Sequence, residues 1–242
     1  MPNKTVTLHR PLIAAILPIY NEVEHIGTML EVLHRIKCLD EIIIVDDGSS
    51  DGTPEKLRQY VDLDSRFRFL QHHTNRGKGQ AVFTGWHSTE AIYLLLLDAD
   101  LKDLTPQHVE DLITPVSAHK AYMTMGLFWG GRLNTDLSHL FTPWLTGQRC
   151  LRAEIMKYVS EEAASGYGFE VALTIAAHQH GYRIRRVIMR GVWHPPSEFH
   201  RGLLKGIPWR LRMYGQILHA LWVTTSRKRF KVRTFLSTIL KP

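Results

Sequence analysis

Short apolar runs alternate along the chain with segments whose apolar residues recur at every third or fourth position. Runs rich in Ile, Val and Leu predict strands at residues 13–17, 41–45, 67–71, 92–97, 121–128 and 183–189. Helical spacing predicts helices over residues 22–35, 54–60, 78–87, 106–115 and 169–180. We interpret residues 143–153 as a loop that enters a helix. Alternating strands and helices are typical of an α/β fold with a mostly parallel sheet flanked by helices.

The length of the chain fits one domain with an appendage at its C-terminal end. A chain of 242 residues, of which 44% are hydrophobic, can bury a sizeable core. We expect residues 1–200 to form the folded domain, with residues 1–115 and 116–200 as its two halves. Residues 201–242 are expected to form a basic amphipathic helical tail.

Two cysteines, Cys38 and Cys150, lack the spacing of a disulfide framework or a structural zinc site. This usage predicts a reducing compartment, so we expect a cytoplasmic protein. The apolar residues 12–17 are too short a run for a secretory signal, and no run approaches the roughly 18 apolar residues of a spanning helix. Any contact with a membrane is therefore expected to be peripheral, at its inner face.

Positive charge gathers in the tail. The chain has a formal net charge of +7, yet no Asp or Glu follows Glu198, while ten Lys and Arg residues do. Trp209, Tyr214 and Trp222 lie among these cations, a combination typical of segments that bind anionic membrane surfaces. The alternative for the first part of the tail is a helix that packs on the core.

Polar clusters follow three of the predicted strands. They are residues 18–22 after the first strand, residues 46–53 after the second and residues 98–100 after the fourth. Taken singly, Asp47-Gly48 is typical of a turn and Asp98 of a helix cap. Ligands of an open parallel sheet bind outside the carboxyl ends of its strands, so the three clusters together predict one binding site there.

These clusters carry a resemblance to family-2 glycosyltransferases, which have the Rossmann-like GT-A fold. The matching segments are residues 17–22, 44–53, 75–79 and 97–100. The resemblance covers about the first 115 residues. It implies that residues 1–115 bind a nucleotide-sugar donor and that residues 116–200 hold the acceptor.

Asp98 and Asp100 form an Asp-x-Asp pair at a strand end. Such a pair suits a hard divalent ion, because Mg²⁺ takes one or two carboxylates and completes its shell with phosphates and water. The resemblance implies that both residues are catalytic and hold Mg²⁺ or Mn²⁺ against the donor diphosphate. Lys102 is a departure, since some lipid-phosphate sugar transferases of the family have Gln two residues after the second Asp.

The resemblance also implies further contacts with the donor. The base and ribose are assigned to Pro18, Tyr20, Glu22 and Asp47. Residues 75–79 open a helix with glycines and cations, which favours a position of Gly77 and Lys78 close to the donor. The alternative for this segment is a plain Gly-rich turn, and its spacing is not that of a Walker loop.

In the second half, the chain resembles the acceptor side of polyprenyl-phosphate sugar transferases and of glucosyl-3-phosphoglycerate synthase. The matching segments are residues 146–149, 166–170 and 191–194. This resemblance implies that His194 is a third metal ligand; the alternative is an ordinary surface or core histidine. Arg149 is a catalytic candidate that holds an anionic acceptor group, or else a solvated cation at a helix start. Glu170 is a catalytic candidate that positions the acceptor, or else a first-turn carboxylate favoured by the helix dipole.

The function predicted from these features is transfer of a hexose from a UDP- or GDP-linked sugar to a phosphate-bearing acceptor, such as a polyprenyl phosphate at the membrane. The alternative acceptor is a small soluble molecule such as 3-phosphoglycerate. A nucleic-acid-binding module would explain the basic tail but none of the first 115 residues, so nucleic acid is the disfavoured partner. A relative that only binds nucleotide is disfavoured because Asp98 and Asp100 are both present.

Overall fold

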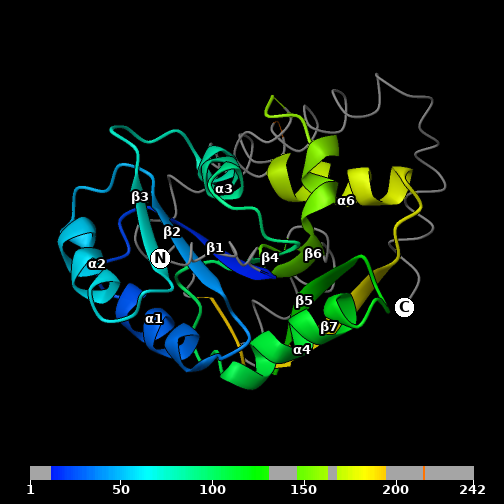
Figure 1. The fold of residues 1–242 in the computed structure, drawn as a ribbon, viewed down its shortest axis with the longest axis horizontal. Helices are drawn as coiled ribbons and strands as arrows, with labels where there is room; N and C mark the ends of the chain where they lie inside the picture. Colours follow the sequence, from blue (N-terminus) through cyan, green and yellow to red (C-terminus); the bar gives the residue numbers. More distant parts are fainter. Residues whose placement is uncertain (1–11, 131–145, 163–167, 195–214, 216–242) are drawn as a thin grey trace, which may run out of the picture.

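A single mixed sheet organises the described part of the chain, which in this computed structural model comprises residues 12–130, 146–162, 168–194 and residue 215. Seven strands of these residues pair in the order β3-β2-β1-β4-β6-β5-β7 (Figure 1). Their bounds are β1 Ile13–Ile19, β2 Glu41–Asp46, β3 Phe67–Gln71, β4 Tyr93–Leu96, β5 Met123–Trp129, β6 Arg149–Arg152 and β7 Ile184–Arg190. All neighbouring pairs are parallel except those of β6, which runs antiparallel to both β4 and β5.

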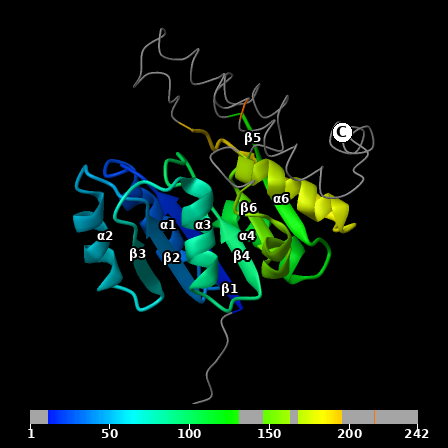
Figure 2. The ribbon, with the colours of Figure 1, turned by 90° about the horizontal axis from the view of Figure 1, so that it is seen from above.

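Helices cover both faces of this sheet, as the two ribbon views show (Figures 1 and 2). One face is covered by α1 (Ile26–Arg35), α2 (Thr53–Val61) and α4 (Pro106–Ser117). The other is covered by α3 (Lys78–His87), the 3-10 helix η2 (Ala153–Tyr158) and α6 (Gly168–Gln179). Two hydrophobic clusters fill the space between the sheet and these helices, one on each side.

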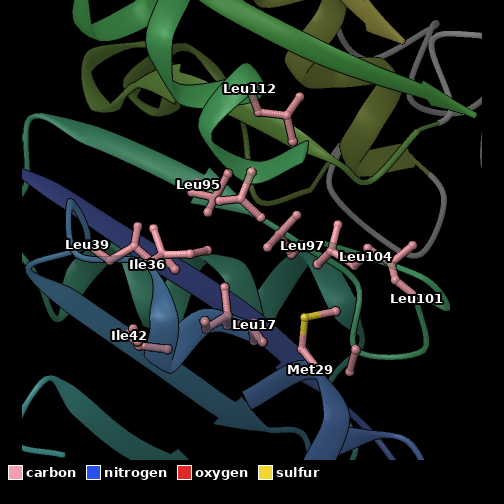
Figure 3. Packing of buried hydrophobic residues seen from close by; sticks show 14 of the residues in the cluster. Leu17, Met29, Ile36, Leu39, Ile42, Leu95, Leu97, Leu101, Leu104 and Leu112 are labelled. Carbon is pink, nitrogen blue, oxygen red and sulfur yellow. The ribbon is translucent and has the colours of Figure 1, made fainter. Parts of the chain in front are cut away.

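The apolar strands supply both clusters at once. In β1, Ala15 and Leu17 belong to the cluster under α1 and α4, while Ala14 and Ile16 belong to the cluster under α3 and α6. Successive side chains of a strand point to opposite faces, so a strand covered on both sides is apolar throughout. Figure 3 shows the first cluster, in which Leu17 lies among leucines and isoleucines of the sheet and its connections.

The predicted α/β architecture is confirmed, and the predicted strands and helices of the described residues lie within a few residues of the observed ones. The interpretation of residues 143–153 as a loop that enters a helix is wrong. Residues 149–152 form strand β6, and a 3-10 helix follows from Ala153. The physical reason is pairing: Arg149–Arg152 bonds to β4 on one side and to β5 on the other, which outweighs the weak local signal of a four-residue segment with a charge at each end.

Two predictions concern residues that the structure describes only in part. The basic tail, residues 201–242, lies outside the described residues apart from residue 215, so its helical and amphipathic character stays a prediction. The division of residues 1–200 into two halves also stays a prediction. Among the described residues, no helix combines the length and the apolar character that crossing a bilayer requires.

The strand order reverses at β1 and β4, and open α/β sheets bind ligands in a crevice at the carboxyl ends of such strands. From β1 the chain proceeds outward through β2 and β3, and it then returns to the other side of β1 to form β4. The connection after β1 leads to β2 on one side, and the connection after β4 leads to β5 on the other side. Open α/β sheets bind ligands where two connections leave in opposite directions in this way. Because β6 is antiparallel, its first residues also lie at this edge: Arg149 pairs with Leu96, the last residue of β4.

Helix α3 approaches the sheet closely at Gly85. A Cβ atom at this position would lie 2.6 Å from Cγ2 of Ile16 in β1 and 3.3 Å from Cγ2 of Val45 in β2. Both contacts are with packed core side chains, so little room exists for an added methyl group. The absence of a side chain at Gly85 thus determines how near α3, and the residues at its start, lie to the carboxyl ends of these strands.

We therefore expect Gly85→Ala to lower the free energy of unfolding by about 1–3 kcal/mol, the usual cost of overpacking a core. Urea denaturation at neutral pH measures this change. Gly27→Ala is the matched control, because its Cβ would meet the flexible end of Lys56 and the hydroxyl of Tyr60 at 3.2–3.4 Å. That variant should be neutral or slightly stabilising, and equal stability of both variants would contradict the account of α3 packing.

Candidate functional site

Asp98 is the second residue after β4 and is held by the side chain of Gln148. The Gln148 amide accepts a hydrogen bond from the Asp98 backbone N–H at 3.0 Å and donates one to Asp98 Oδ2 at 2.8 Å. Gln148 is fully buried and immediately precedes β6. This two-point contact fixes both the backbone and the carboxylate of Asp98, and it depends on the antiparallel course of β6.

Lys78, the first residue of α3, bridges two carboxylates. Its Nζ lies 2.6 Å from Asp98 Oδ1 and 2.7 Å from Glu170 Oε1 at the start of α6. Burial alone would lower the pKa of the ammonium, but the charges of Asp98 and Glu170 outweigh it and raise the pKa above its ordinary value. Burial likewise opposes the charge on Asp98, yet Lys78 holds the pKa of that carboxyl below its ordinary value. The site thus contains a lysine and an aspartate that are both charged at neutral pH.

Glu170 is almost completely buried, with 3% of its surface exposed. Lys78 satisfies Oε1, but Oε2 has no hydrogen-bond partner among the residues that the structure describes. A buried carboxylate oxygen without a donor is costly, and such an atom in a native structure is often satisfied by a ligand or an ordered water. Glu170 therefore has an acceptor oxygen that the described residues leave unsatisfied, next to Lys78.

Gly147 allows these groups to meet. A Cβ atom on it would collide with Asp98 Oδ2 and would lie 2.6 Å from Lys78 Nζ. Both approaches are closer than real Cβ contacts, so any side chain at this position would displace the carboxylate or the ammonium. In the segment before β6, Gly147 thus leaves space for the Asp98 carboxylate, and the Gln148 side-chain amide binds it.

His194, which follows β7, lies at the same edge of the sheet. Its Nδ1 lies 2.9 Å from Asp100 Oδ1, and its Nε2 lies 3.9 Å from Asp98 Oδ2. Burial opposes protonation, but the hydrogen bond and charge of Asp100 outweigh it, and the pKa of His194 is raised above its ordinary value. In the neutral ring, an Nδ1–H donated to Asp100 leaves the lone pair of Nε2 for another partner.

The backbone beside His194 is tied to the loop after β4. Lys102 and Trp193 exchange backbone hydrogen bonds at 3.0 and 3.4 Å, and the Trp193 indole N–H donates to Asp103 at 2.9 Å. The turn begins at Gly191, whose φ of +80° is a conformation that side-chain-bearing residues rarely adopt. Lys102, the departure noted in the sequence, therefore contributes its backbone to positioning His194.

The residues present fit a divalent metal ion. Asp98, Asp100 and His194 offer carboxylate oxygens and an imidazole nitrogen, donors that suit Mg²⁺ and Mn²⁺. The 3.9 Å between Asp98 Oδ2 and His194 Nε2 is compatible with one ion at bond lengths of about 2.1 Å. Among the described residues, no three such side chains already form an open metal-binding group. In this structure, Asp100 is hydrogen-bonded to His194, and Asp98 forms an ion pair with Lys78.

Asp47 organises the loop that leads into α3. Its Oδ1 accepts hydrogen bonds from His72 at 2.7 Å and from the Arg76 backbone N–H at 2.9 Å, and its Oδ2 accepts one from the Gly77 N–H at 2.7 Å. His72 also contacts Thr84 of α3 at 2.9 Å. Asp47 is buried, so its observed contacts position the segment before Lys78. The predicted contact of Asp47 with the base stays a prediction.

Close backbone approach at Gly48 supports the same loop. A Cβ on Gly48, whose φ is +78°, would lie 2.8 Å from the backbone carbon of Thr74 and 2.9 Å from the nitrogen of Asn75. Gly77 has a φ of +93°, which also favours glycine. Gly48 thus allows the β2 and β3 connections to lie side by side, and Gly77 allows the backbone turn that leads into α3.

The connection after β1 lies at the same edge of the sheet and is bonded to the connection after β2. Asn21 donates its backbone N–H to Ser49 at 2.8 Å and accepts one from the Ser50 N–H at 2.9 Å, which joins this connection to that after β2. Burial raises the pKa of Glu22, and Asp100 adds to the effect, although the hydrogen bond with His25 opposes it. Tyr20 is 47% exposed, which leaves its ring accessible for stacking. Pro18 lies in β1 beside Val45.

Arg149 is fully buried, so the alternative of a solvated cation at a helix start is wrong. It donates to the Thr146 carbonyl oxygen at 2.9 Å and to Thr174 Oγ1 at 2.8 Å. Burial lowers the pKa of Arg149 to about 10, and the charges of Glu170 and Asp98 oppose that shift. These contacts join the segment before β6 to α6. Its predicted contact with an acceptor stays a prediction.

The structure brings most of the predicted site residues together. Asp98, Lys78 and Glu170 form one charged group, and Asp100 and His194 a neighbouring pair. The sequence interpretation did not assign a role to Gln148, although it belongs to the Thr-Gly-Gln-Arg segment. Nor did it identify His72, because this residue belongs to no motif and its role depends on Asp47.

Comparison with known proteins gives one family and a set of relatives. The model of the family described as glycosyl transferase family 2 matches residues 14–179. The chain is 32% identical over 163 residues to dolichyl-phosphate beta-glucosyltransferase of Dictyostelium discoideum, an alignment that covers 60% of this chain and 46% of that protein. It is 29% identical over 119 residues to undecaprenyl-phosphate 4-deoxy-4-formamido-L-arabinose transferase of Proteus mirabilis (strain HI4320), covering 47% and 36%. The chain thus spans less than half the length of these relatives.

Solved structures share the fold. A crystal structure of glucosyl-3-phosphoglycerate synthase from Mycobacterium tuberculosis in complex with Mn²⁺, UDP-glucose and phosphoglyceric acid gives a TM-score of 0.69 at 20% identity, over 89% of this chain and 80% of that chain. The same synthase in complex with Mg²⁺ and UDP gives 0.69 at 21% identity, over 88% and 79%. These likenesses confirm the predicted GT-A fold.

Proposed function

The chain belongs to glycosyl transferase family 2, and we propose that it transfers a hexose from a UDP- or GDP-linked sugar to a phosphate-bearing acceptor with the help of Mg²⁺ or Mn²⁺. The observation that carries this proposal is the convergence of Asp98, Asp100 and His194 at the carboxyl edge of the sheet, where His194 lies within 4 Å of each aspartate. Lys78 lies in direct contact with this group. An anionic diphosphate and a divalent ion together complement such a mixture of carboxylates, imidazole and ammonium.

In this proposal, Asp98, Asp100 and His194 would hold the divalent ion, which would supply positive charge to the departing nucleoside diphosphate. Lys78 donates to phosphate oxygens of the donor, at the N-terminus of α3 where backbone N–H groups also face an anion. Gln148 keeps the Asp98 carboxylate oriented. The protein's own residues thus bind the diphosphate and set the direction in which it leaves.

The base and ribose occupy the space bordered by the connections after β1 and β2. Tyr20 is exposed there and offers a ring face to a base, while Glu22 offers a carboxylate to hydroxyl or N–H donors. Pro18 and Asp47 support these connections from the ends of their strands. Gly77 has a φ of +93°, a conformation that side-chain-bearing residues rarely adopt, directly before Lys78 at the start of α3.

Glu170 serves the sugar or the acceptor. Its Oε2 is buried without a hydrogen-bond donor, and a hydroxyl group of a bound sugar would supply one. Arg149 of β6 lies near Glu170 and donates a hydrogen bond to Thr174, which belongs to α6 as Glu170 does. It contributes positive charge to this part of the site. We assign Glu170 a positioning role for a hydroxyl group and Arg149 a role in the anionic-acceptor region.

The acceptor proposal rests on a chemical feature that the relatives' names share. Dolichyl phosphate, undecaprenyl phosphate and phosphoglyceric acid all carry a phosphate group. A phosphate acceptor already offers an ionised oxygen as nucleophile and needs no general base to remove its proton. We favour a polyprenyl phosphate, with 3-phosphoglycerate as the alternative. Release of nucleoside diphosphate in the presence of each acceptor distinguishes them.

Removing a carboxylate of the metal pair should abolish turnover of the donor. We expect Asp100→Ala to lower metal-dependent release of nucleoside diphosphate roughly 100-fold or more, because His194 loses its partner and the ion loses a ligand. A panel of UDP- and GDP-sugars with Mn²⁺ or Mg²⁺, scored first by thermal shift, provides the assay. Asp62→Ala, at an exposed position after α2, is the control for loss of a carboxylate. An unchanged rate for Asp100→Ala would exclude the metal role.

We also propose that the basic tail attaches the protein to an anionic membrane, at its cytoplasmic face. The supporting observation is the sequence itself, which has ten cations and no carboxylate after Glu198. A polyprenyl-phosphate acceptor would be found at such a surface. Neutral lipid would bind the tail less strongly, since each cation near an anionic surface contributes about 1 kcal/mol.

Flotation of the full chain with liposomes tests this attachment. We expect co-flotation with vesicles that contain anionic lipid, little with neutral vesicles, and a marked loss when the chain is truncated after Ser226. Equal flotation with both kinds of vesicle, together with no effect of truncation, would overturn the proposal.

A further inference from the structure

The carboxylates that would hold the metal are already paired with groups of the protein. Lys78 Nζ contacts Asp98 Oδ1 at 2.6 Å, and Gln148 contacts Asp98 Oδ2 at 2.8 Å. Asp100 Oδ1 is paired with His194 Nδ1. In this arrangement, one ammonium, that of Lys78, forms ion pairs with both Asp98 and Glu170. A divalent ion that entered alone would face a fixed ammonium at a few ångströms, and like charges at that distance repel.

Space as well as charge opposes such an ion. The ammonium lies between two carboxylates and against the backbone of Gly147, where an added Cβ would be only 2.6 Å from Nζ. An ion therefore cannot reach Asp98 Oδ1 while the ammonium remains there, and an ion at Oδ2 beside His194 must share the charge of that carboxylate with the ammonium. The two cations compete for one carboxylate.

The ammonium has a route out of this position. About a third of the Lys78 side chain is exposed, and Lys78 is the first residue of α3. The backbone before it is held by Asp47, which accepts hydrogen bonds from Arg76 and Gly77. The flexible side chain can thus swing while the helix start stays fixed. A diphosphate at this helix start offers oxygens that replace the carboxylates as partners of the ammonium.

We propose that Lys78 is a displaceable counter-ion, which occupies Asp98 and Glu170 until a nucleoside diphosphate withdraws it, so that metal and nucleotide bind as one unit. This inference rests on the proposed function, because it takes the nucleotide and the divalent ion from it. Its consequence is coupling: each of the two ligands increases the affinity for the other, by the same factor. Withdrawal of the ammonium also leaves both oxygens of Glu170 available to a bound hydroxyl group.

Binding of Mn²⁺ without nucleotide tests the proposal on the full chain. We expect Lys78→Gln to bind Mn²⁺ alone roughly tenfold more tightly than the wild type, in the usual range of coupling between sites. Calorimetric titration or the electron paramagnetic resonance of free Mn²⁺ measures this affinity. The same titration in saturating UDP should show a smaller gain from nucleotide in Lys78→Gln than in the wild type.

Two further variants separate this role from general effects. Lys120→Gln removes an equal charge at an exposed position between α4 and β5, at the opposite edge of the sheet, and should leave Mn²⁺ binding unchanged. Lys78→Arg keeps the cation and should resemble the wild type in Mn²⁺ alone. Circular dichroism of each variant establishes that it is folded.

The outcomes are distinct. If Lys78→Gln is folded and binds Mn²⁺ alone no more tightly than the wild type, Lys78 is a fixed structural partner of Asp98 and the counter-ion proposal is overturned. If Lys78→Gln does not fold, the wild type alone decides. The counter-ion proposal is overturned if UDP does not change the affinity of the wild type for Mn²⁺. If the wild type binds neither UDP nor Mn²⁺ when both are present, the proposed function fails as well.

Discussion

A largely buried carboxylate, Asp98 at the carboxyl end of β4 with 21% of its side chain exposed, is the constraint on which the site depends. Asp98 loses much of its hydration there, and such a loss is costly unless charge and hydrogen bonds replace the water. The replacements come from separate parts of the chain: an ammonium from α3 and an amide from the segment before β6. The partners also depend on Asp98 for hydrogen bonds and charge, because Gln148 is fully buried and Lys78 is partly buried.

The sheet makes this meeting possible through the direction of its strands. Parallel β1, β2 and β4 bring their carboxyl ends to one edge, and the antiparallel β6 brings its amino end to the same edge. Two glycines then permit approach: Gly85 lets α3 lie close on the sheet, and Gly147 leaves space for the Asp98 carboxylate. A parallel strand in place of β6 would carry Gln148 to the far edge. The mixed character of the sheet is thus a requirement of the site.

Much of this arrangement was predictable from the sequence, because apolar runs and helical spacing are local signals. The aspartates after the apolar runs, and the Gly-rich entry into α3, were correctly placed at one edge of a parallel sheet. Strand β6 was not predictable in the same way: Arg149–Arg152 is short, begins and ends with a charge, and becomes a strand only by pairing on both sides. The role of Gln148 depends on the position of β6, so it was not predictable either. The contacts of Asp47 with Arg76 and Gly77 are likewise tertiary, and no spacing rule indicates them.

The central claim is that Asp98, Asp100 and His194 surround a divalent ion that is shared with a nucleoside diphosphate. Crystals of the full chain soaked with Mn²⁺ and UDP, measured by anomalous scattering of manganese, test it most directly. The account predicts one manganese within about 2.3 Å of an Asp98 oxygen, in contact with the diphosphate. A nucleotide bound in the crevice with Asp98 free of any ion, and with manganese absent or elsewhere, would contradict it.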